Sequence, residues 1–274
     1  MPPASGGGAW TDLDRPPLSQ ARLQRALGAG GPWREVRVVA STSSTNADAL
    51  AAAATGAAEG LVVVAEQQVA GRGRLSRAWE SPARAGLLVS VLLRPSLPPA
   101  ALPLLPLLAG LALADAVEAV ADVAVGLKWP NDLLVGGRKL GGILAERAPD
   151  GAVVVGFGIN VSTRREELPV DTATSLALEG GGTDREPLLK ECLRSLQRRY
   201  AHFVEAGGAP TAVLPPYRER CETIGRRVTV HAPDGTTSTG LATGVDDSGT
   251  LVVRDDDGRD IRWSAGDVVH VRGE

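Results

Sequence analysis

Residues 128–146 read KWPNDLLVGGRKLGGILAE and combine two lysines with a Trp-Pro-Asn-Asp turn and two Gly-Gly pairs. The runs LLV and GILA are strand-like. The Gly-Gly pair between them predicts a tight hairpin turn, because glycine tolerates the positive φ angles of such turns. This hairpin would bring Lys139 close to Lys128, Asn131 and Asp132. The chain has three lysines in all, so two ammonium groups at one hairpin favour a functional role over an ordinary surface hairpin.

A second segment, residues 71–79, reads GRGRLSRAW and predicts an anion-binding loop. Its glycines let backbone N–H groups approach oxygen atoms closely, and each guanidinium can hold a phosphate or carboxylate through two hydrogen bonds. The segment lacks the Gly-Lys-Ser/Thr ending of a nucleotide-binding P-loop. A nucleic-acid contact is the alternative, but such arginine-glycine segments are usually repeated and interleaved with aromatic residues. A flexible loop that orders over an anionic substrate fits better.

Two further segments carry polar groups at the ends of predicted elements. Residues 41–50 read STSSTNADAL, in which Thr45 and Asp48 have the spacing of a capping box at a helix start. The neighbouring Ser44, Thr45 and Asn46 can donate and accept hydrogen bonds, which suits a small amide or urea group. Residues 156–161 read GFGINV and predict a strand ending at Asn160. Taken alone, a glycine-rich strand end usually reflects packing.

Taken in their order along the chain, the four segments resemble the biotin protein ligase family. The STN triplet, the GRGR loop, KWPND with GRKLGG, and GFGINV all match, and a small predicted barrel follows. The resemblance covers residues 36–274, and the short N-terminal part is similar to the class without the DNA-binding domain. It implies an α+β fold, in which a catalytic domain of the biotin/lipoyl ligase type, like class II synthetases, has a mixed β-sheet. A small SH3-like β-barrel would follow at the C-terminus.

The resemblance also implies residue roles. Ser44, Thr45, Asn46, Gln68 and Gly142 would bind the bicyclic head group of biotin. Gly71, Arg72, Gly73 and Arg74 would surround its carboxylate and, after reaction, the adenylate phosphate. Lys139 would contact the carboxylate and the α-phosphate, so Lys139 and Arg74 are the expected catalytic residues. The nucleotide side would involve Arg74, Arg77, Trp79, Asn131, Lys139 and Asn160, and Asp132 would orient the acceptor lysine or a metal ion.

One residue departs from the family pattern. The loop usually reads GRGRxGR, and here Ser76 stands in place of the later glycine. If that position needs a positive φ angle, serine costs on the order of 1 kcal/mol and would stiffen the loop or slow its closure. The arginines are unaffected.

The activity implied by the resemblance is a two-step ligation. Biotin and Mg²⁺-bound ATP would give biotinyl-5′-adenylate and pyrophosphate, and a lysine on the biotin carboxyl carrier domain of an acyl-CoA carboxylase would then take the biotinyl group. Arginine and lysine side chains would offset the repulsion between the two anions. The metal would enter with ATP and not at a protein-built site. Recognition of the carrier partly by strand pairing, and a monomer or a ligand-promoted homodimer, are the further expectations.

The elements that must position these residues follow from periodicity. Strands are expected at residues 36–40, 61–66, 87–93 and 152–161, and helices at residues 19–27, 47–54, about 103–121 and 187–205. Without regular strand-helix-strand alternation, this order predicts a mixed sheet. Five short strands between PDG, DSG and DDG turns predict the C-terminal barrel, which would dock on the main domain. The expected domains are a disordered and short helical segment at 1–35, the catalytic domain at 36–222 and the barrel at 223–274.

Composition narrows the class of protein. A net charge of −3 implies no general attraction to nucleic acid or anionic lipid, and the two cysteines form neither a metal-binding spacing nor a disulfide framework. Residues 1–17 lack the pattern of a signal peptide, so a cytoplasmic location is expected. Residues 97–114 are uncharged, but four prolines in the first half and acidic residues just beyond favour a buried helix over a membrane span.

Three other functions remain as alternatives. A lipoate or octanoate ligase on the same fold would need a more apolar pocket without the polar set around Gln68. A biotin-sensing repressor needs a winged helix-turn-helix of about 60 residues, and about 35 precede the first predicted strand. A non-catalytic binding module built round the barrel would leave the arginines and Lys139 without a purpose.

Overall fold

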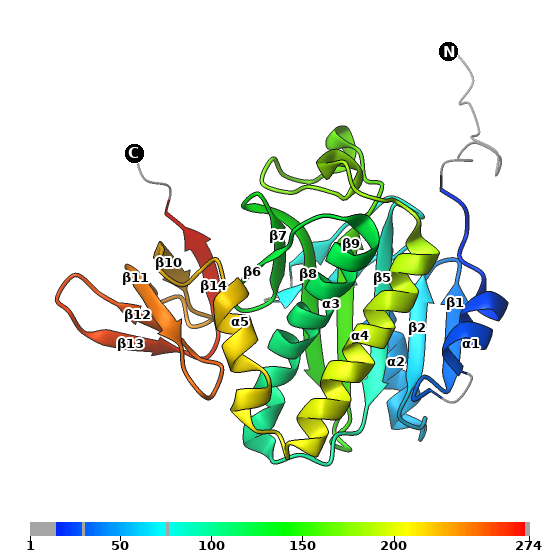
Figure 1. Ribbon diagram of the computed structural model, residues 1–274, viewed down its shortest axis with the longest axis horizontal. Coiled ribbons are helices and arrows are strands. Elements are labelled where there is room, and N and C mark those ends of the chain that lie inside the picture. The colour runs from blue at the N-terminus through cyan, green and yellow to red at the C-terminus, as the bar shows by residue number, and fades with distance from the viewer. Residues whose placement is uncertain (1–14, 29–30, 75–76, 272–274) are drawn as a thin grey trace.

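The computed structural model describes residues 15–28, 31–74 and 77–271. A seven-stranded sheet lies between two helical layers, and a five-stranded sheet lies beside it (Figure 1). The order in the large sheet is β1-β2-β5-β9-β8-β7-β6. Its strands are β1 (Glu35–Val39), β2 (Leu61–Ala65), β5 (Gly86–Leu93), β6 (Gly126–Lys128), β7 (Asp132–Val135), β8 (Arg138–Arg147) and β9 (Val153–Asn160). Because β1 and β2 are parallel and the other neighbours antiparallel, the predicted mixed sheet is confirmed.

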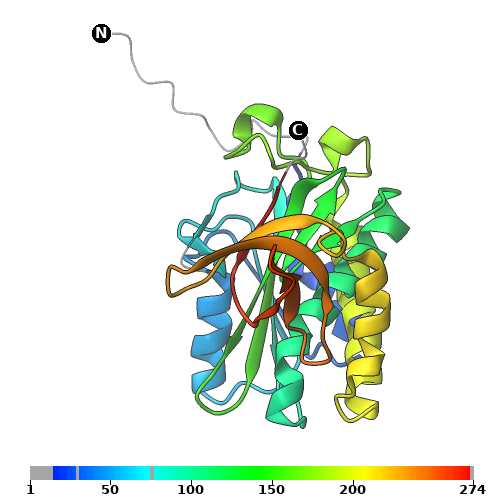
Figure 2. The ribbon, with the colours of Figure 1, turned by 90° about the vertical axis from the view of Figure 1, so that its left-hand side faces the viewer.

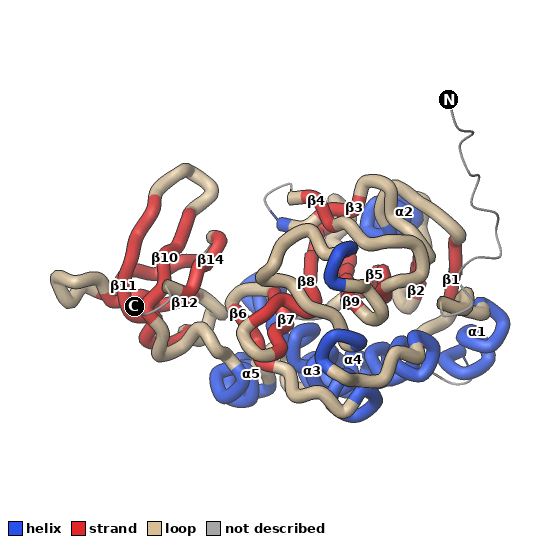
Figure 3. The backbone as a smooth tube through the Cα atoms, turned by 90° about the horizontal axis from the view of Figure 1, so that it is seen from above, coloured by secondary structure: helices blue, strands red, loops and turns tan. Residues whose placement is uncertain are grey.

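The helices cover both faces of the large sheet. Helix α2 (Thr45–Ala54) lies on one face, and α3 (Leu105–Ala121) and α4 (Arg185–Glu205) lie on the other (Figures 2 and 3). Helix α1 (Gln20–Gly28) lies next to β1, and α5 (Leu214–Arg220) faces the small sheet (Figure 1). Short 3₁₀ helices are η2 (Pro99–Leu104), η3 (Arg165–Glu167), η4 (Ala177–Glu179) and η5 (Pro210–Ala212).

The apolar runs in the central strands are explained by this layering. All eight residues of β5, GLLVSVLL, and all eight of β9, VVVGFGIN, are buried. A strand covered on both faces needs apolar side chains at successive positions instead of alternate ones. Against the α2 face the core is built largely of alanine, from Ala49, Ala52 and Ala53. Small side chains let α2 approach the sheet closely, and its first turn therefore lies near the strands.

The apolar stretch at residues 97–114 belongs to a buried helical segment. Pro99–Ala121 is the one helix in the described residues that is long and apolar enough to cross a membrane, with a hydropathy of 1.9, and 72% of its most apolar window is buried in the protein. Its acidic side faces water in part, since Asp122 is exposed and Asp115 and Glu118 are half-buried. Asp115 also pairs with Arg199 of α4 at 2.7 Å and with Arg220 of α5 at 3.2 Å.

The segment before β1 packs against the domain of the large sheet from Arg15 onward. Arg15 is 5% exposed and donates to Glu167 at 2.6 Å. The buried Leu23, Leu27 and Trp33 belong to the main core. Residues 1–14, at the start of the segment 1–35 for which disorder was expected, lie outside the described residues. The predicted helix at residues 19–27 is confirmed as Gln20–Gly28.

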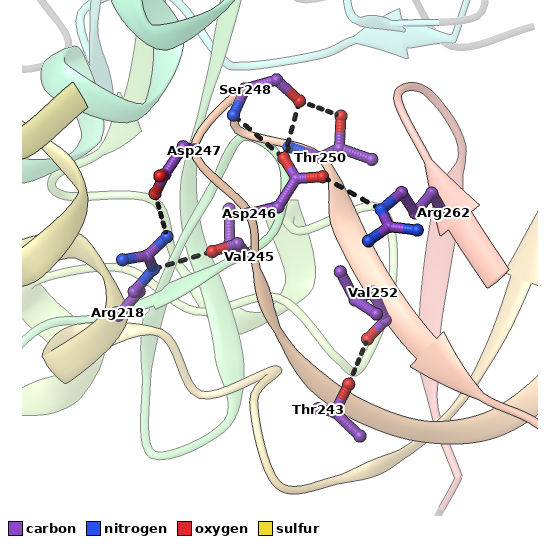
Figure 4. A network of polar contacts seen from close by, with 9 residues as sticks. All are labelled: Arg218, Thr243, Val245, Asp246, Asp247, Ser248, Thr250, Val252 and Arg262. Atoms are coloured by element: carbon purple, nitrogen blue, oxygen red, sulfur yellow. Dashed lines mark hydrogen bonds and ion pairs between the residues drawn. The ribbon is translucent and has the colours of Figure 1, made fainter. Parts of the chain in front are cut away.

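The C-terminal sheet packs onto the domain of the large sheet. It has the order β13-β12-β11-β10-β14, with β10 (Arg227–His231), β11 (Thr237–Val245), β12 (Leu251–Arg254), β13 (Asp260–Trp263) and β14 (Asp267–His270), all antiparallel. Five strands and the docking are therefore confirmed, while closure into an SH3-like barrel stays a prediction. Its apolar residues join the main core. Arg218 of α5 donates to Val245 O at 2.7 Å and to Asp247 at 2.9 Å (Figure 4).

Candidate active site

One pocket gathers residues from every segment singled out in the sequence. It encloses about 850 Å³, counting the open solvent at its mouth. It lies on the α2 side of the sheet, where the first turn of α2, the short hairpin β3 (Gly71–Arg72)–β4 (Ala78–Trp79) and strands β5, β8 and β9 meet. The lining residues are Ser44, Thr45, Asn46, Gln68, Arg72, Gly73, Arg74, Arg77, Ala78, Trp79, Val89, Asn131, Asp132, Lys139, Gly142, Ile143, Leu144, Gly156, Phe157, Gly158, Gly266 and Asp267.

The first turn of α2 supplies the polar groups at one part of the pocket. Ser44, not the expected Thr45, is the N-cap, and its side chain accepts from Ala47 N. Thr45 is therefore free to face Gln68, whose Oε1 accepts from Thr45 N at 2.8 Å and lies 3.0 Å from Thr45 Oγ1. The predicted grouping of Ser44, Thr45, Asn46 and Gln68 is present.

Two polar residues behind this group had not been predicted. Ser90 Oγ lies 2.8 Å from Thr45 Oγ1 and 2.6 Å from Asn46 Oδ1, and Asn46 Nδ2 donates to Glu146 at 2.6 Å. Asn46 thus borders the pocket with its amide already engaged by protein groups. The available signal for Ser90 was its position as the one polar residue in a buried apolar strand.

The arginine-glycine loop forms the cationic part of the pocket. Arg72, Gly73 and Arg74 line it, whereas Gly71 packs against Trp79 and Gln68 and is not among the lining residues. Burial lowers the pKa of Arg74, and the charges of Asp132 and Asp267 oppose that shift. Neither Arg72 nor Arg74 has a carboxylate within ion-pair distance among the described residues, so both guanidinium groups can receive an anion. The question raised by Ser76 lies outside the described residues.

The KWPND hairpin has the predicted geometry. Gly136 and Gly137 occupy the turn with φ angles of 55° and 73°. Lys139 Nζ lies 2.6 Å from Asp132 Oδ1, and Lys128 Nζ lies 3.9 Å from Asp132 Oδ2. Asp132 therefore sits between two ammonium groups, as the sequence had suggested.

Lys139 and Trp79 form the opposite wall. Lys139 Nζ lies 5.8 Å from the centroid of the Trp79 ring, within the range of a cation–π contact. Gly142 lies against both side chains. A Cβ at Gly158 would lie 2.5 Å from the Trp79 ring, so this glycine of GFGINV is required for the indole to fit. Trp79 Nε1 is buried without a hydrogen-bond partner among the described residues.

Two of the residues expected at the nucleotide side already donate hydrogen bonds to backbone carbonyls of the protein. Asn131 lines the pocket, but its side-chain amide donates to Ile143 O at 2.8 Å. Asn160 lies outside the lining and donates to Thr174 O at 2.9 Å, because the segment after β9 folds over the end of that strand. The nucleotide-side role expected for Asn160 stays a prediction.

The C-terminal domain also reaches the pocket, which had not been predicted. Gly266 and Asp267 are lining residues, and Asp267 pairs with Arg77 at 2.5 Å. Overall the pocket has four cationic side chains, Arg72, Arg74, Arg77 and Lys139, against Asp132 and Asp267. The surplus of positive charge suits an anionic ligand. The described residues contain no group of three His, Cys, Asp or Glu that could hold a metal ion.

Comparisons with known proteins agree with this arrangement. Residues 37–163 match the biotin/lipoate A/B protein ligase family, and residues 223–271 match the biotin protein ligase C terminal domain. The biotin–acetyl-CoA-carboxylase ligase of Mycobacterium tuberculosis is 45% identical over 96% of this chain and 100% of its own length. The bifunctional ligase/repressor of Bacillus subtilis is 36% identical over 79% of this chain and 68% of its own length.

A solved structure shares the fold as well as the sequence pattern. The biotin protein ligase from Aquifex aeolicus in complex with biotin and ATP superposes with a TM-score of 0.73 at 26% identity, covering 87% of this chain and 100% of its own. Together with full-length similarity to the mycobacterial relative, this settles the family. The chain belongs to the biotin protein ligase family.

Proposed function

We propose that this protein is an ATP-dependent ligase that activates biotin as biotinyl-5′-adenylate and transfers it to a lysine of a biotin carboxyl carrier domain. The observation that carries the proposal is one pocket that joins a polar set at Thr45 and Gln68 to the cationic groups of Arg72, Arg74 and Lys139. The mycobacterial relative is named a biotin–acetyl-CoA-carboxylase ligase, and that name supports both the substrate and the class of acceptor.

The pocket composition accounts for the substrate. Thr45 and Gln68 provide hydrogen-bonding groups for the urea of biotin, and Val89, Ile143 and Phe157 provide apolar surface for its ring and chain. A pocket for lipoate or octanoate would need no polar pair at this place. The solved relative that holds biotin and ATP supports the same assignment.

In the first step, the carboxylate of biotin attacks the α-phosphorus of ATP, an oxygen–phosphorus bond forms, and pyrophosphate leaves. Two anions must approach each other for this reaction. Arg72, Arg74 and Lys139 would offset the repulsion and stabilise the charge that grows on the α-phosphate. Mg²⁺ would enter with the nucleotide. Asp132, at 2.6 Å from Lys139, keeps that ammonium group at the pocket before the anions arrive.

In the second step, the amine of the acceptor lysine attacks the acyl carbon of the adenylate and AMP leaves. The mixed anhydride is sensitive to water, so its enclosure by the arginine-glycine loop has a chemical purpose. Asp132 is the carboxylate closest to Lys139 in the pocket, and we assign it to orienting the incoming amine. Recognition of the carrier domain partly by strand pairing remains part of the proposal.

The proposal also covers the domain boundaries, the cellular location and the oligomeric state. We keep a catalytic domain at residues 36–222 and a C-terminal domain at residues 223–274, which the family match at residues 223–271 supports. A cytoplasmic location is supported by two buried cysteines, Cys192 and Cys221, that form no disulfide. We expect a monomer or a ligand-promoted homodimer, with no binding to DNA or membranes.

The test is pyrophosphate exchange into ATP, with purified protein and Mg²⁺, in parallel with biotin, lipoate and octanoate. Exchange that depends on biotin alone would support carboxylate adenylation and the substrate. Exchange with lipoate or octanoate would instead assign the chain to the lipoate or octanoate ligases of the same family. If none of the three supports exchange, the proposed activity is wrong. Transfer is then followed with a purified carrier domain and labelled biotin.

A further inference from the structure

A chain of buried and partly buried hydrogen bonds runs from Glu146 to the pocket. Asn46 Nδ2 lies 2.6 Å from Glu146 Oε2 and 3.2 Å from Leu144 O. On its other side, Asn46 Oδ1 lies 2.6 Å from Ser90 Oγ, which lies 2.8 Å from Thr45 Oγ1. Ser90 is fully buried, and Asn46 and Thr45 are 5% and 4% exposed. These groups therefore exchange hydrogen bonds mainly with one another.

The direction of each hydrogen bond follows from counting hydrogens. The carboxylate of Glu146 and the carbonyl of Leu144 can only accept, so the NH₂ group of Asn46 must face them. Asn46 Oδ1 then faces Ser90, and the single hydroxyl hydrogen of Ser90 must point to it. The Ser90 oxygen can therefore only accept a hydrogen bond from the neighbouring hydroxyl group, that of Thr45.

This direction, together with the backbone N–H of Thr45, sets what Thr45 and Gln68 present to a ligand. The hydroxyl hydrogen of Thr45 has two acceptors within the protein, Ser90 Oγ at 2.8 Å and Gln68 Oε1 at 3.0 Å. In both cases the lone pairs of Thr45 are left for the pocket. Gln68 Oε1 also accepts Thr45 N–H at 2.8 Å, so the NH₂ group of Gln68 is left to donate. The pocket thus offers an acceptor beside a donor.

The backbone around the network is shaped to hold it. A side chain at Gly156 of β9 would overlap the amide of Asn46. Ser90 is paired across the sheet with this same glycine, inside a strand that is otherwise apolar. Burying a hydroxyl group is costly unless it is hydrogen-bonded, and an alanine would suit the strand better for packing alone. The placement of Ser90 therefore favours a role toward the ligand.

We propose that Ser90 and Glu146 are positioning residues that select the ligand's head group. With the Ser90 hydrogen directed to Asn46, Ser90 does not donate to Thr45, so the lone pairs of Thr45 stay free to accept from the ligand beside the Gln68 donor. The complementary ligand has an N–H next to a C=O, as a cyclic urea does. Neither residue needs to touch the ligand, and Ser90 is not a lining residue. The inference rests on the proposed function, because it assigns the specificity of that same pocket.

The test compares two adenylate analogues that differ only in the acyl group, biotinyl-sulfamoyl-adenosine and octanoyl-sulfamoyl-adenosine. The ratio of their dissociation constants, measured by calorimetry, isolates the contribution of the head group. The variants are Ser90→Ala and Glu146→Gln. The matched control is Ser195→Ala, which removes another buried hydroxyl, 1% exposed, on α4, where Ser195 Oγ lies 3.5 Å from Asp115.

For Ser90→Ala we expect the preference for the biotinyl analogue to fall roughly tenfold, the effect of about one lost buried hydrogen bond. Binding of the octanoyl analogue should be unchanged, because the adenylate side is intact. Glu146→Gln should shift the ratio the same way, since a glutamine can donate and lets the Asn46 amide turn round. Ser195→Ala should leave the ratio as in the wild type.

An unchanged ratio in Glu146→Gln, or in a folded Ser90→Ala protein, would overturn the inference. Equal loss of binding for both analogues would also overturn it, since that is the result of general damage to the fold. If Ser90→Ala does not fold, Glu146→Gln decides alone. Failure of the proposed function looks different, because the wild-type protein itself would then show no preference for the biotinyl analogue.

Discussion

Arg77 of the arginine-glycine loop and Asp267 of β14 are joined by two hydrogen bonds, of 3.0 and 2.5 Å, although they lie 190 residues apart in the sequence. The pair links the C-terminal domain to the loop over the catalytic pocket. The Arg77 side chain is 63% exposed, so the pair contributes little to global stability. The hydrogen bonds with Asp267 raise the pKa of Arg77. The contact matters because it holds the loop at the pocket.

We expect Asp267→Asn to make the closed pocket leak. Without the ion pair the loop opens more often, so free biotinyl-adenylate should appear about 1.4-fold to fivefold faster, which corresponds to the roughly 0.2–1 kcal/mol of an exposed pair. The measurement is adenylate release without a carrier domain, together with labelling of an unrelated protein. Asp256→Asn is the control, because it breaks a similar pair with Arg227, at 2.8 Å, away from the pocket. Equal release in both variants would contradict a tether at Arg77.

Lys139→Ala should abolish most adenylate formation while the fold remains. Its ammonium group lies beside Asp132 at 2.6 Å and over Trp79, where the reacting carboxylate and phosphate would meet. Losing one preorganised positive charge costs on the order of 10²- to 10³-fold in rate. Pyrophosphate exchange measures the loss. Lys190→Ala serves as the control, since Lys190 pairs with Glu186 of α4, at 2.7 Å, outside the pocket. Near-normal exchange in Lys139→Ala would remove its assigned role.

The pH dependence of stability should contain a contribution from His270. Burial lowers its pKa to about 4, with Lys128 and Arg226 adding to the shift, whereas an unfolded histidine has a pKa of about 6.5. Between these values the unfolded chain binds more protons, so stability falls as the pH falls from about 6.5 toward 4. Allowing for the partial exposure of the ring, the loss is about 1 kcal/mol.

His270 has this effect because its ring lies at the contact between the two domains. Thr223 Oγ1 accepts Trp129 N–H at 3.0 Å and lies 3.2 Å from His270 Nε2, an arrangement that suits a neutral ring able to accept. Thermal unfolding of the wild type and of His270→Gln, measured between pH 7 and pH 4.5, checks this. The variant should lose less stability over this interval. Parallel curves for the two proteins would rule out His270 as the source.

Local patterns predicted most elements because each one is specified by neighbouring residues. The Gly136-Gly137 turn and the apolar stripe of α4 are examples, and both appear as expected. The pocket was predictable to the extent that its residues fall in short motifs, such as the STN triplet and the GRGR loop. The resemblance assigned their roles, which periodicity alone could not do.

The features that the sequence did not indicate depend on contacts between distant segments. The chain beyond β9 returns over Asn160, and Thr174 O accepts from its side-chain amide, so the nucleotide role of Asn160 stays a prediction. Asp267 joins the pocket through domain docking, for which the sequence near residue 267 carries no signal. Ser90 acts through residues 45 and 46, on a different element. Such relationships depend on tertiary packing, which local propensity does not determine.

The β1 edge of the large sheet is closed by two glutamines of α1. Val36 N donates to Gln24 Oε1 at 2.7 Å, and Val38 N donates to Gln20 Oε1 at 2.9 Å. Four residues of an α-helix rise about 6 Å, and two residues of a strand span roughly 6.6 Å. Glutamines four apart on a helix can therefore serve alternate N–H groups of a strand. Unpaired edge groups of this kind invite pairing with another chain.

We therefore expect the double variant Gln20→Ala/Gln24→Ala to expose the edge. Hydrogen exchange of the Val36 and Val38 amides should accelerate, while Arg37 and Val39, which face β2 in the parallel pair, should stay protected. Light scattering should detect concentration-dependent self-association. Arg25→Ala, an exposed change on the same helix, is the matched control. If the double variant stays as monodisperse as this control and keeps slow exchange at Val36 and Val38, the glutamines do not guard the edge.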